Sequence, residues 1–207
     1  GVWKFIYVPT IAASIKDFYR IDLPDSNWDT ITVPSNWEIQ GFGEPIIRNI
    51  QYVFSSNPPY IDVDNPVGTY RRTFTVPRNW QEREVFLHFG SISGYARIYV
   101  NGQQVGMTKA SKTPAEFNVT NYLKEGENLL AVQIYRWHDG SYMEDQDFWR
   151  LTGIERDVFL QAYPKLTIWD FFLKSSLDST YKNGIFNATV DLREFTGNNV
   201  KKGTLKL

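Results

Sequence analysis

Short stretches in which apolar and polar residues alternate constrain the fold of this chain most. A period of two is typical of a strand with one buried face. Two such stretches, residues 85–89 and 96–100, are separated by only a few residues. Asn101-Gly102 follows the second, and this dipeptide favours the positive φ angles that a tight hairpin turn needs. The alternation therefore predicts antiparallel β-structure.

The same pattern recurs along most of the chain. Between the strands lie clusters of Gly, Pro and Asn, and one short helical segment is expected after Pro9. Asn183-Gly184 predicts a second hairpin turn. Many short strands with few helices predict an all-β fold, either a β-sandwich or a jelly roll. The further strands are expected at residues 2–8, 31–33, 68–76, 129–137, 157–163, 166–173 and 185–192.

Pro164 marks the expected domain border. Residues 1–163 are predicted to form the first β domain, a β-sandwich or jelly roll, and residues 164–207 the first strands of a second β domain. An immunoglobulin-like sandwich takes about 100 residues. The second domain is therefore expected to be incomplete, and the first residues already have the pattern of a strand interior.

Composition excludes several classes of function. The net charge is −1 with no basic block, which argues against a nucleic-acid partner. No apolar run approaches the roughly 20 residues of a membrane span, and no signal peptide is visible. Two histidines and no cysteine are too few for an ordinary zinc cluster. The lack of cysteine leaves both a cytoplasmic and a periplasmic location open.

Residues 136–150 form the most informative loop, here called the acidic loop. It carries four carboxylates among four aromatic residues, so disorder is not expected. Such a loop suits a cation or a set of sugar hydroxyls. In the alternative interpretation, its acids cap their own backbone and pair with Arg136, Arg150 and Arg156. Residues 41–66 form a second irregular aromatic segment, either a ligand loop or a packed connection.

Several long motifs resemble the β-galactosidases of glycoside hydrolase family 2. The likeness extends to about Tyr163. The motifs are Trp137-x-Asp139-Gly140-Ser141-Tyr142-x-Glu144-Asp145-Gln146-Asp147-x-Trp149-Arg150, Val33-Pro34-Ser35-Asn36-Trp37, Pro45-Ile46-x-x-Asn49-x-x-Tyr52, Asn65-Pro66-x-Gly68-x-Tyr70 and Asn101-Gly102-x-x-Val105-Gly106.

This resemblance implies a domain order. A galactose-binding-like jelly roll is followed by an immunoglobulin-like domain, then by a barrel in which two glutamates act by the retaining route. Neither glutamate is expected in this chain, so it has no catalytic residues and is predicted to be inactive alone.

The resemblance also implies three site residues. Asn49 and Asp147 are expected to reach the galactose pocket, with Asp147 also a ligand of a sodium ion completed by the barrel. Carboxylate oxygens suit hard cations and accept hydrogen bonds from sugar hydroxyls. His138, where a small polar residue is often found, is a candidate contact to the leaving sugar. Magnesium is expected in the complete enzyme, with no ligands here.

Three alternatives stay open beside a β-galactosidase. A β-glucuronidase or β-mannosidase belongs to the same family, although no cationic cluster for a uronate is visible near Asn49 or Asp147. A carbohydrate-binding module without catalysis would bind galactosides by itself. Jelly rolls of this family also take part in subunit contacts, so the complete enzyme is expected to be a homo-oligomer.

Overall fold

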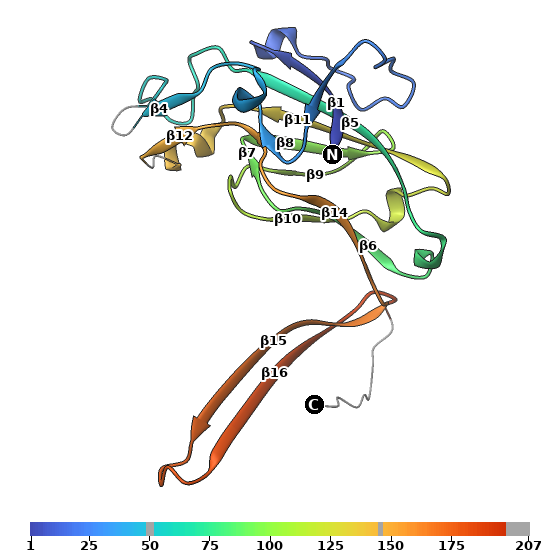
Figure 1. Ribbon diagram of the computed structural model, residues 1–207, viewed down its shortest axis with the longest axis vertical. Helices are drawn as coiled ribbons and strands as arrows, with labels where there is room; N and C mark the ends of the chain where they lie inside the picture. The colour runs from blue at the N-terminus through green and yellow to red at the C-terminus, as the bar shows by residue number, and fades with distance from the viewer. Residues whose placement is uncertain (49–51, 145–146, 198–207) are drawn as a thin grey trace.

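Two facing β-sheets enclose the core in the computed structural model, which describes residues 1–48, 52–144 and 147–197 (Figure 1). The larger sheet has the strand order β2-β1-β5-β11-β8-β9 and the smaller β10-β6-β14. The bounds are β1 Val2–Val8, β2 Asp29–Thr32, β5 Val67–Thr75, β8 Tyr95–Val100, β9 Gln103–Thr108 and β11 Glu127–Tyr135 in the first, and β6 Glu84–Phe89, β10 Ala115–Asn118 and β14 Val158–Tyr163 in the second.

The core lies where the inward faces of these sheets meet. Ile98 of β8 and Ile134 of β11 are fully buried, and Phe89 of β6 packs in the same cluster. Trp37 is also fully buried, and its indole N–H donates to the Tyr70 hydroxyl. The predicted all-β sandwich is confirmed, whereas the jelly-roll connection order stays a prediction.

The predicted hairpin turn is present, whereas most of the helical segment predicted after Pro9 is not. Asn101 and Gly102 have φ angles of 50° and 84°, so the predicted hairpin between β8 and β9 is confirmed. The helical segment is reduced to the 3-10 turn η1, Ile11–Ala13. Side chains of the larger sheet take its carbonyls: Gln133 donates to Ile15 O, and Arg71 donates to the Phe18 carbonyl.

Two small sheets lie beside the sandwich. Three short strands form the order β3-β13-β7, and two form the ribbon β12-β4. Among the described residues, no helix is long and apolar enough to cross a membrane. The bounds are β3 Ser35–Asn36, β7 Ile92–Ser93, β13 Gly153–Ile154, β4 Ile46–Arg48 and β12 Phe148–Arg150, with 3-10 turns η2 Glu38–Gln40, η3 Arg78–Trp80, η4 Thr120–Tyr122 and η5 Asp139–Met143.

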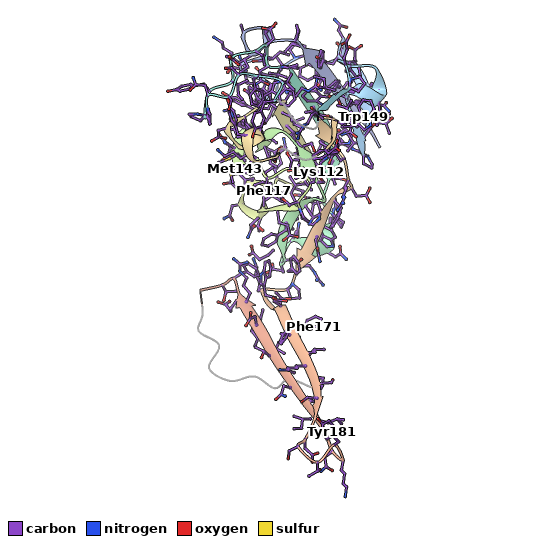
Figure 2. All side chains as sticks on the ribbon, turned by 90° about the vertical axis from the view of Figure 1, so that its left-hand side faces the viewer. Lys112, Phe117, Met143, Trp149, Phe171 and Tyr181 are labelled. Carbon is purple, nitrogen blue, oxygen red and sulfur yellow. The ribbon has the colours of Figure 1, made fainter. Side chains whose placement is uncertain are left out.

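A long hairpin, β15 Leu166–Leu177 and β16 Gly184–Glu194, projects from the sandwich (Figures 1 and 2). Its turn spans residues 178–183 instead of Asn183-Gly184, since Gly184 already pairs with Leu177. The Asp178 carboxylate accepts backbone N–H groups of Thr180 and Lys182, which organises this longer turn.

Candidate functional site

The acidic loop lies against the other irregular segment at one end of the sandwich (Figure 1). β12 pairs antiparallel with β4, with Trp149 opposite Ile47. At the start of the loop, the Arg136 N–H donates to Pro66 O at 3.0 Å. The two segments that the sequence marks as candidate ligand loops are therefore neighbours.

Asn65 fixes the point at which the acidic loop leaves β11. Its side-chain oxygen accepts the Trp137 N–H at 2.9 Å, and its amide donates to the Trp137 carbonyl at 2.7 Å. Both residues are buried. An Asn side chain is suited to this because its amide both donates and accepts.

Aromatic residues clamp the middle of the loop. The Tyr142 hydroxyl is 2.8 Å from Ser55 O and 2.6 Å from Tyr60 O, with hydrogen bonds to both. The centroid of its ring lies 4.8 Å from that of Phe54, and the Phe54 centroid lies 5.6 Å from that of Trp137. These rings bind one loop to the other, so their geometry indicates a packing role.

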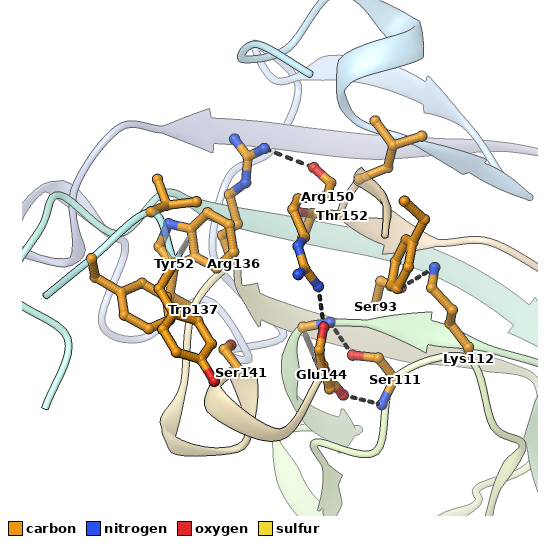
Figure 3. A pocket seen from close by; sticks show the side chains of 15 residues that line it. Tyr52, Ser93, Ser111, Lys112, Arg136, Trp137, Ser141, Glu144, Arg150 and Thr152 are labelled. Atoms are coloured by element: carbon orange, nitrogen blue, oxygen red, sulfur yellow. Dashed lines mark hydrogen bonds between the residues drawn. The ribbon is translucent and has the colours of Figure 1, made fainter. Parts of the chain in front are cut away.

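A buried ion pair between Arg136 and Glu38 supports the loop. Arg136 Nη2 lies 3.4 Å from Glu38 Oε1. It also donates to Arg150 O at 2.8 Å, a hydrogen bond drawn in Figure 3. Glu38 Oε2 accepts the Thr152 N–H at 2.9 Å. Burial raises the pKa of Glu38 and lowers the pKa of Arg136. Arg136 thus pairs with a distant acid instead of one in its own loop.

His138 caps the turn η5. Its Nδ1 accepts the Gly140 N–H at 3.1 Å, while its backbone N–H donates to Ser141 Oγ at 3.1 Å. The side chain is 6% exposed. Burial, the largest effect, lowers the pKa of His138 from its ordinary value, although the Glu144 and Asp139 carboxylates act in the opposite direction.

Two more acids of the loop have partners outside it. Asp139 holds Lys109 Nζ with both oxygens at 2.8 Å, and hydrogen bonding by this lysine lowers the Asp139 pKa. Glu144 Oε1 accepts the Ser111 N–H at 3.1 Å. For Asp139 and Glu144, contacts to the 109–111 segment take the place of the arginine pairing that one interpretation of the sequence expects.

A cleft of about 300 Å³ opens beside the loop (Figure 3). The Phe148 ring at its edge has two cations near its face: Lys112 Nζ is 4.9 Å from the centroid and Arg150 Cζ 5.0 Å. Lys112 also contacts Glu155 Oε1 at 3.1 Å. Burial alone would raise the Glu155 pKa, but hydrogen bonds from Ser93 and Asn36 and the Lys112 charge outweigh it, so the pKa is lowered.

The structure treats the three predicted site residues differently. Asp147 is exposed directly before β12, and its carboxylate makes no hydrogen bond or ion pair within the described ranges. Asn49 lies outside the described residues. His138 is buried with one ring nitrogen engaged. A sugar contact by any of these residues stays a prediction.

Asp147 offers one carboxylate to a cation. No group of three or more His, Asp or Glu side chains able to bind an ion occurs in the part of the chain that the structure describes. An exposed carboxylate fits a hard cation as one donor.

Some residues of the site carried no signal in the sequence analysis. Glu38 directly follows the Val33–Trp37 motif, and its place beside this motif is the one sequence feature that could have pointed to it. Lys109 and Lys112 contact the loop only through tertiary structure, and Glu155 is joined to it through Lys112. Nothing in their spacing indicates this.

Comparison with known proteins agrees with the motifs. Residues 1–164 match the family described as "Glycosyl hydrolases family 2, sugar binding domain". A β-galactosidase of Priestia megaterium is 40% identical over 200 residues, covering 94% of this chain and 19% of the relative. One from Vibrio cholerae is 42% identical over 196 residues, covering 95% and 19%. The chain thus spans about a fifth of the length of these relatives.

Solved structures share the fold. A β-glucuronidase of an uncultured Clostridium sp. has a TM-score of 0.69 and 27% identity, covering 93% of this chain and 32% of that one. A β-glycosidase of Bacteroides vulgatus, at 21% identity and a TM-score of 0.67, covers 93% and 23% and is similar in fold. This chain belongs to glycosyl hydrolase family 2, and residues 1–164 match its sugar binding domain.

Proposed function

We propose that this chain is the N-terminal, non-catalytic part of a retaining β-galactosidase that hydrolyses terminal β-D-galactosides. Relatives named β-galactosidase, 40% and 42% identical over nearly the whole chain, support this substrate. The catalytic glutamates would lie in the remaining four fifths of such a protein, so residues 1–207 should be inactive alone.

One observation carries the proposed role of this chain. Asp147 presents an exposed carboxylate directly before β12, in a loop whose first part is held by Asn65 and by the Tyr142 hydroxyl. A carboxylate held this way can accept hydrogen bonds from sugar hydroxyls at little further ordering cost. Bonds that strengthen in the transition state lower the barrier as well as KM.

The test is an assay of the longer polypeptide on three nitrophenyl glycosides. We expect the β-galactoside to have the highest kcat/KM, above the β-glucuronide and the β-mannoside. A preference for either of the other two would overturn the proposed substrate. Residues 1–207 serve as the control and should show no turnover of any of them.

We further propose a sodium ion bound by Asp147 and by oxygens of the missing barrel, with magnesium elsewhere in the complete enzyme. The ion would supply a fixed positive charge beside the sugar hydroxyls. Asn49 would complete this wall of the pocket with an amide. Assembly into a homo-oligomer is proposed for the complete enzyme, and sedimentation of that enzyme tests it.

A β-glucuronidase is the second candidate. Lys112 and Arg150 flank the cleft beside Phe148, and cations of this kind suit a uronate carboxylate. The 27% identical Clostridium structure is a β-glucuronidase. Galactosidase names at higher sequence identity favour the first candidate.

We propose that the hairpin β15–β16 begins an immunoglobulin-like domain after Pro164. The bulge between Ile168 and Asp170 shifts the alternation so that the apolar residues on both sides of it share one face. Facing them on β16 are further apolar residues. This face, with Leu166, Ile168, Phe171, Leu173, Leu177, Phe186 and Leu192, is exposed in residues 1–197 and needs a second sheet to cover it.

A further inference from the structure

We propose that His138 is a positioning residue: its neutral imidazole supplies one acceptor to the cap of the turn η5, and protonation of the ring removes that acceptor and weakens the cap. The effect on catalysis rests on the proposed function of Asp147. The cap itself does not, because it is a property of the loop.

The hydrogen bonds around His138 select one form of the ring. Nδ1 accepts the Gly140 N–H at 3.1 Å, so Nδ1 must carry a lone pair and the proton must lie on Nε2. Ser141 completes a reciprocal cap, because its Oγ accepts the His138 N–H and its own N–H donates to His138 O at 2.9 Å.

Charged groups face the ring from two elements. From the acidic loop, Asp139 Oδ1 lies 3.7 Å from Nδ1, and Glu144 Oε2 lies 3.9 Å from Nε2. From the segment after β9, Lys109 neutralises Asp139. Glu144 is itself fixed by the Ser111 N–H. Nε2 is buried without a hydrogen-bond partner among the described residues, so the ring is held in the turn by its Nδ1 contact.

A proton on Nδ1 destroys this arrangement. The new N–H would point at the Gly140 N–H, so two donors would face each other where a hydrogen bond had been. The imidazolium would also be drawn toward Asp139 Oδ1, which already accepts the Gly140 N–H at 2.9 Å. The cap of η5 then loses the acceptor on the ring and is weakened, while the Gly140 N–H keeps its bond to Asp139 Oδ1 and Ser141 keeps its bonds to the His138 backbone. Asp147 follows η5 in the same loop, and we expect its position to respond to this cap.

The pH dependence has a definite sign. Burial lowers the pKa of His138 below its ordinary value of 6.5 in the folded protein. The released or unfolded loop therefore binds the proton more tightly than the capped loop. The cap is fully stable above pH 6.5, and its stability is lost as the pH falls through the lower pKa of the folded state.

Hydrogen exchange in the complete polypeptide tests the cap directly. We expect protection of peptides covering residues 139–144 to fall by about 5-fold, the value of one N-cap, on acidification through the folded-state pKa of His138. His138→Asn keeps an acceptor at the cap but does not titrate, so its protection should not depend on pH in this range. His138→Ala should lack this protection at every pH. Equal pH dependence in wild type and His138→Asn would overturn the proposal.

The other histidine provides a matched control. The chain has two histidines, and His88 lies on β6, paired with Glu116. His88→Gln should leave exchange of residues 139–144 unchanged. It also assigns the imidazole signals of this chain in ¹⁵N spectra. We expect His138 to be the Nε2–H tautomer at neutral pH, and an Nδ1–H tautomer would contradict the cap.

Kinetics separates this proposal from the proposed function. The acid limb of the kcat/KM profile should move to lower pH in His138→Asn and stay in place in His88→Gln. If exchange responds as expected but no β-galactoside is hydrolysed, the proposed function fails and the cap stands. If galactosidase activity is present but exchange and the acid limb ignore His138, the positioning role fails.

Discussion

At the scale of single residues, the surroundings of Asp147 distinguish it from the other acids of the loop. The acidic loop has four acids, yet Asp139 and Glu144 are engaged by Lys109 and the Ser111 N–H. Asp147 alone among the described three is exposed without such a partner. A carboxylate that is not engaged by its own domain is free to bind a ligand that lies between this domain and another one.

Asp147→Asn in the complete enzyme tests that role. The amide keeps the shape but removes the charge, so sodium activation should weaken and turnover should slow by at least about 10-fold, the effect of 1.4 kcal/mol at the transition state. Initial rates on the nitrophenyl galactoside across a sodium titration measure both effects. Asp178→Asn, in the distant hairpin turn, is the control. Unchanged sodium dependence would exclude Asp147 as a ligand.

Gly68 shows how a single atom can matter in the core. A Cβ at this position would lie 2.4 Å from Trp37 Cζ2 and 2.9 Å from Phe5 Cε2, and both rings are fully buried. Gly68→Ala should therefore lower the free energy of unfolding by about 3 kcal/mol, as overpacking does. Gly184→Ala, whose Cβ would meet no atom within 4 Å, should change it little. Urea unfolding of residues 1–207 measures both, and equal effects would contradict this account.

At the scale of elements, the strands were predictable and their irregular neighbours were not. The alternation in β6 and β8, and the Asn101-Gly102 turn, are local properties that the fold preserves. The helical pattern after Pro9 failed because Arg71 and Gln133 of the sheet take its carbonyls. Likewise, the acidic loop was predictable as a feature, whereas its Glu38, Lys109 and Asn65 contacts join segments far apart in the sequence.

The contact between the Asn65 side chain and the Trp137 backbone can be tested for its effect on the rigidity of the loop. Asn65→Ala leaves the N–H and C=O of buried Trp137 without their partner, at a cost of about 1–3 kcal/mol for each stranded group. We expect a lower unfolding free energy and faster exchange in the 137–144 peptides. Asn57→Ala, an exposed residue of the same irregular segment, is the matched control. The clamp would be refuted if both variants exchanged alike.

At the scale of the whole molecule, the two parts of the chain bury their apolar residues to different degrees. The sandwich encloses a full core, whereas the hairpin leaves one apolar face exposed and turns Asp170, Lys174 and Asp191 to the other. An aromatic cluster of Phe86, Tyr163, Trp169 and Phe195 joins the hairpin base to the sandwich. The hairpin is thus anchored at its base and uncovered along its length.

Two adjacent phenylalanines of β15 allow the covering of the apolar face to be tested. Phe171 and Phe172 are 63% and 69% exposed here but point to opposite faces of β15. If the following polypeptide covers the apolar face, Phe171→Lys should destabilise the complete protein by about 3–5 kcal/mol, the range for losing a buried phenylalanine. Phe172→Lys, on the polar face, should cost little. In residues 1–207 alone, Phe171→Lys should instead raise solubility, because it interrupts an exposed apolar surface. Thermal unfolding of both variants in both lengths decides, and an equal response of the two phenylalanines would mean that no second sheet packs on this face.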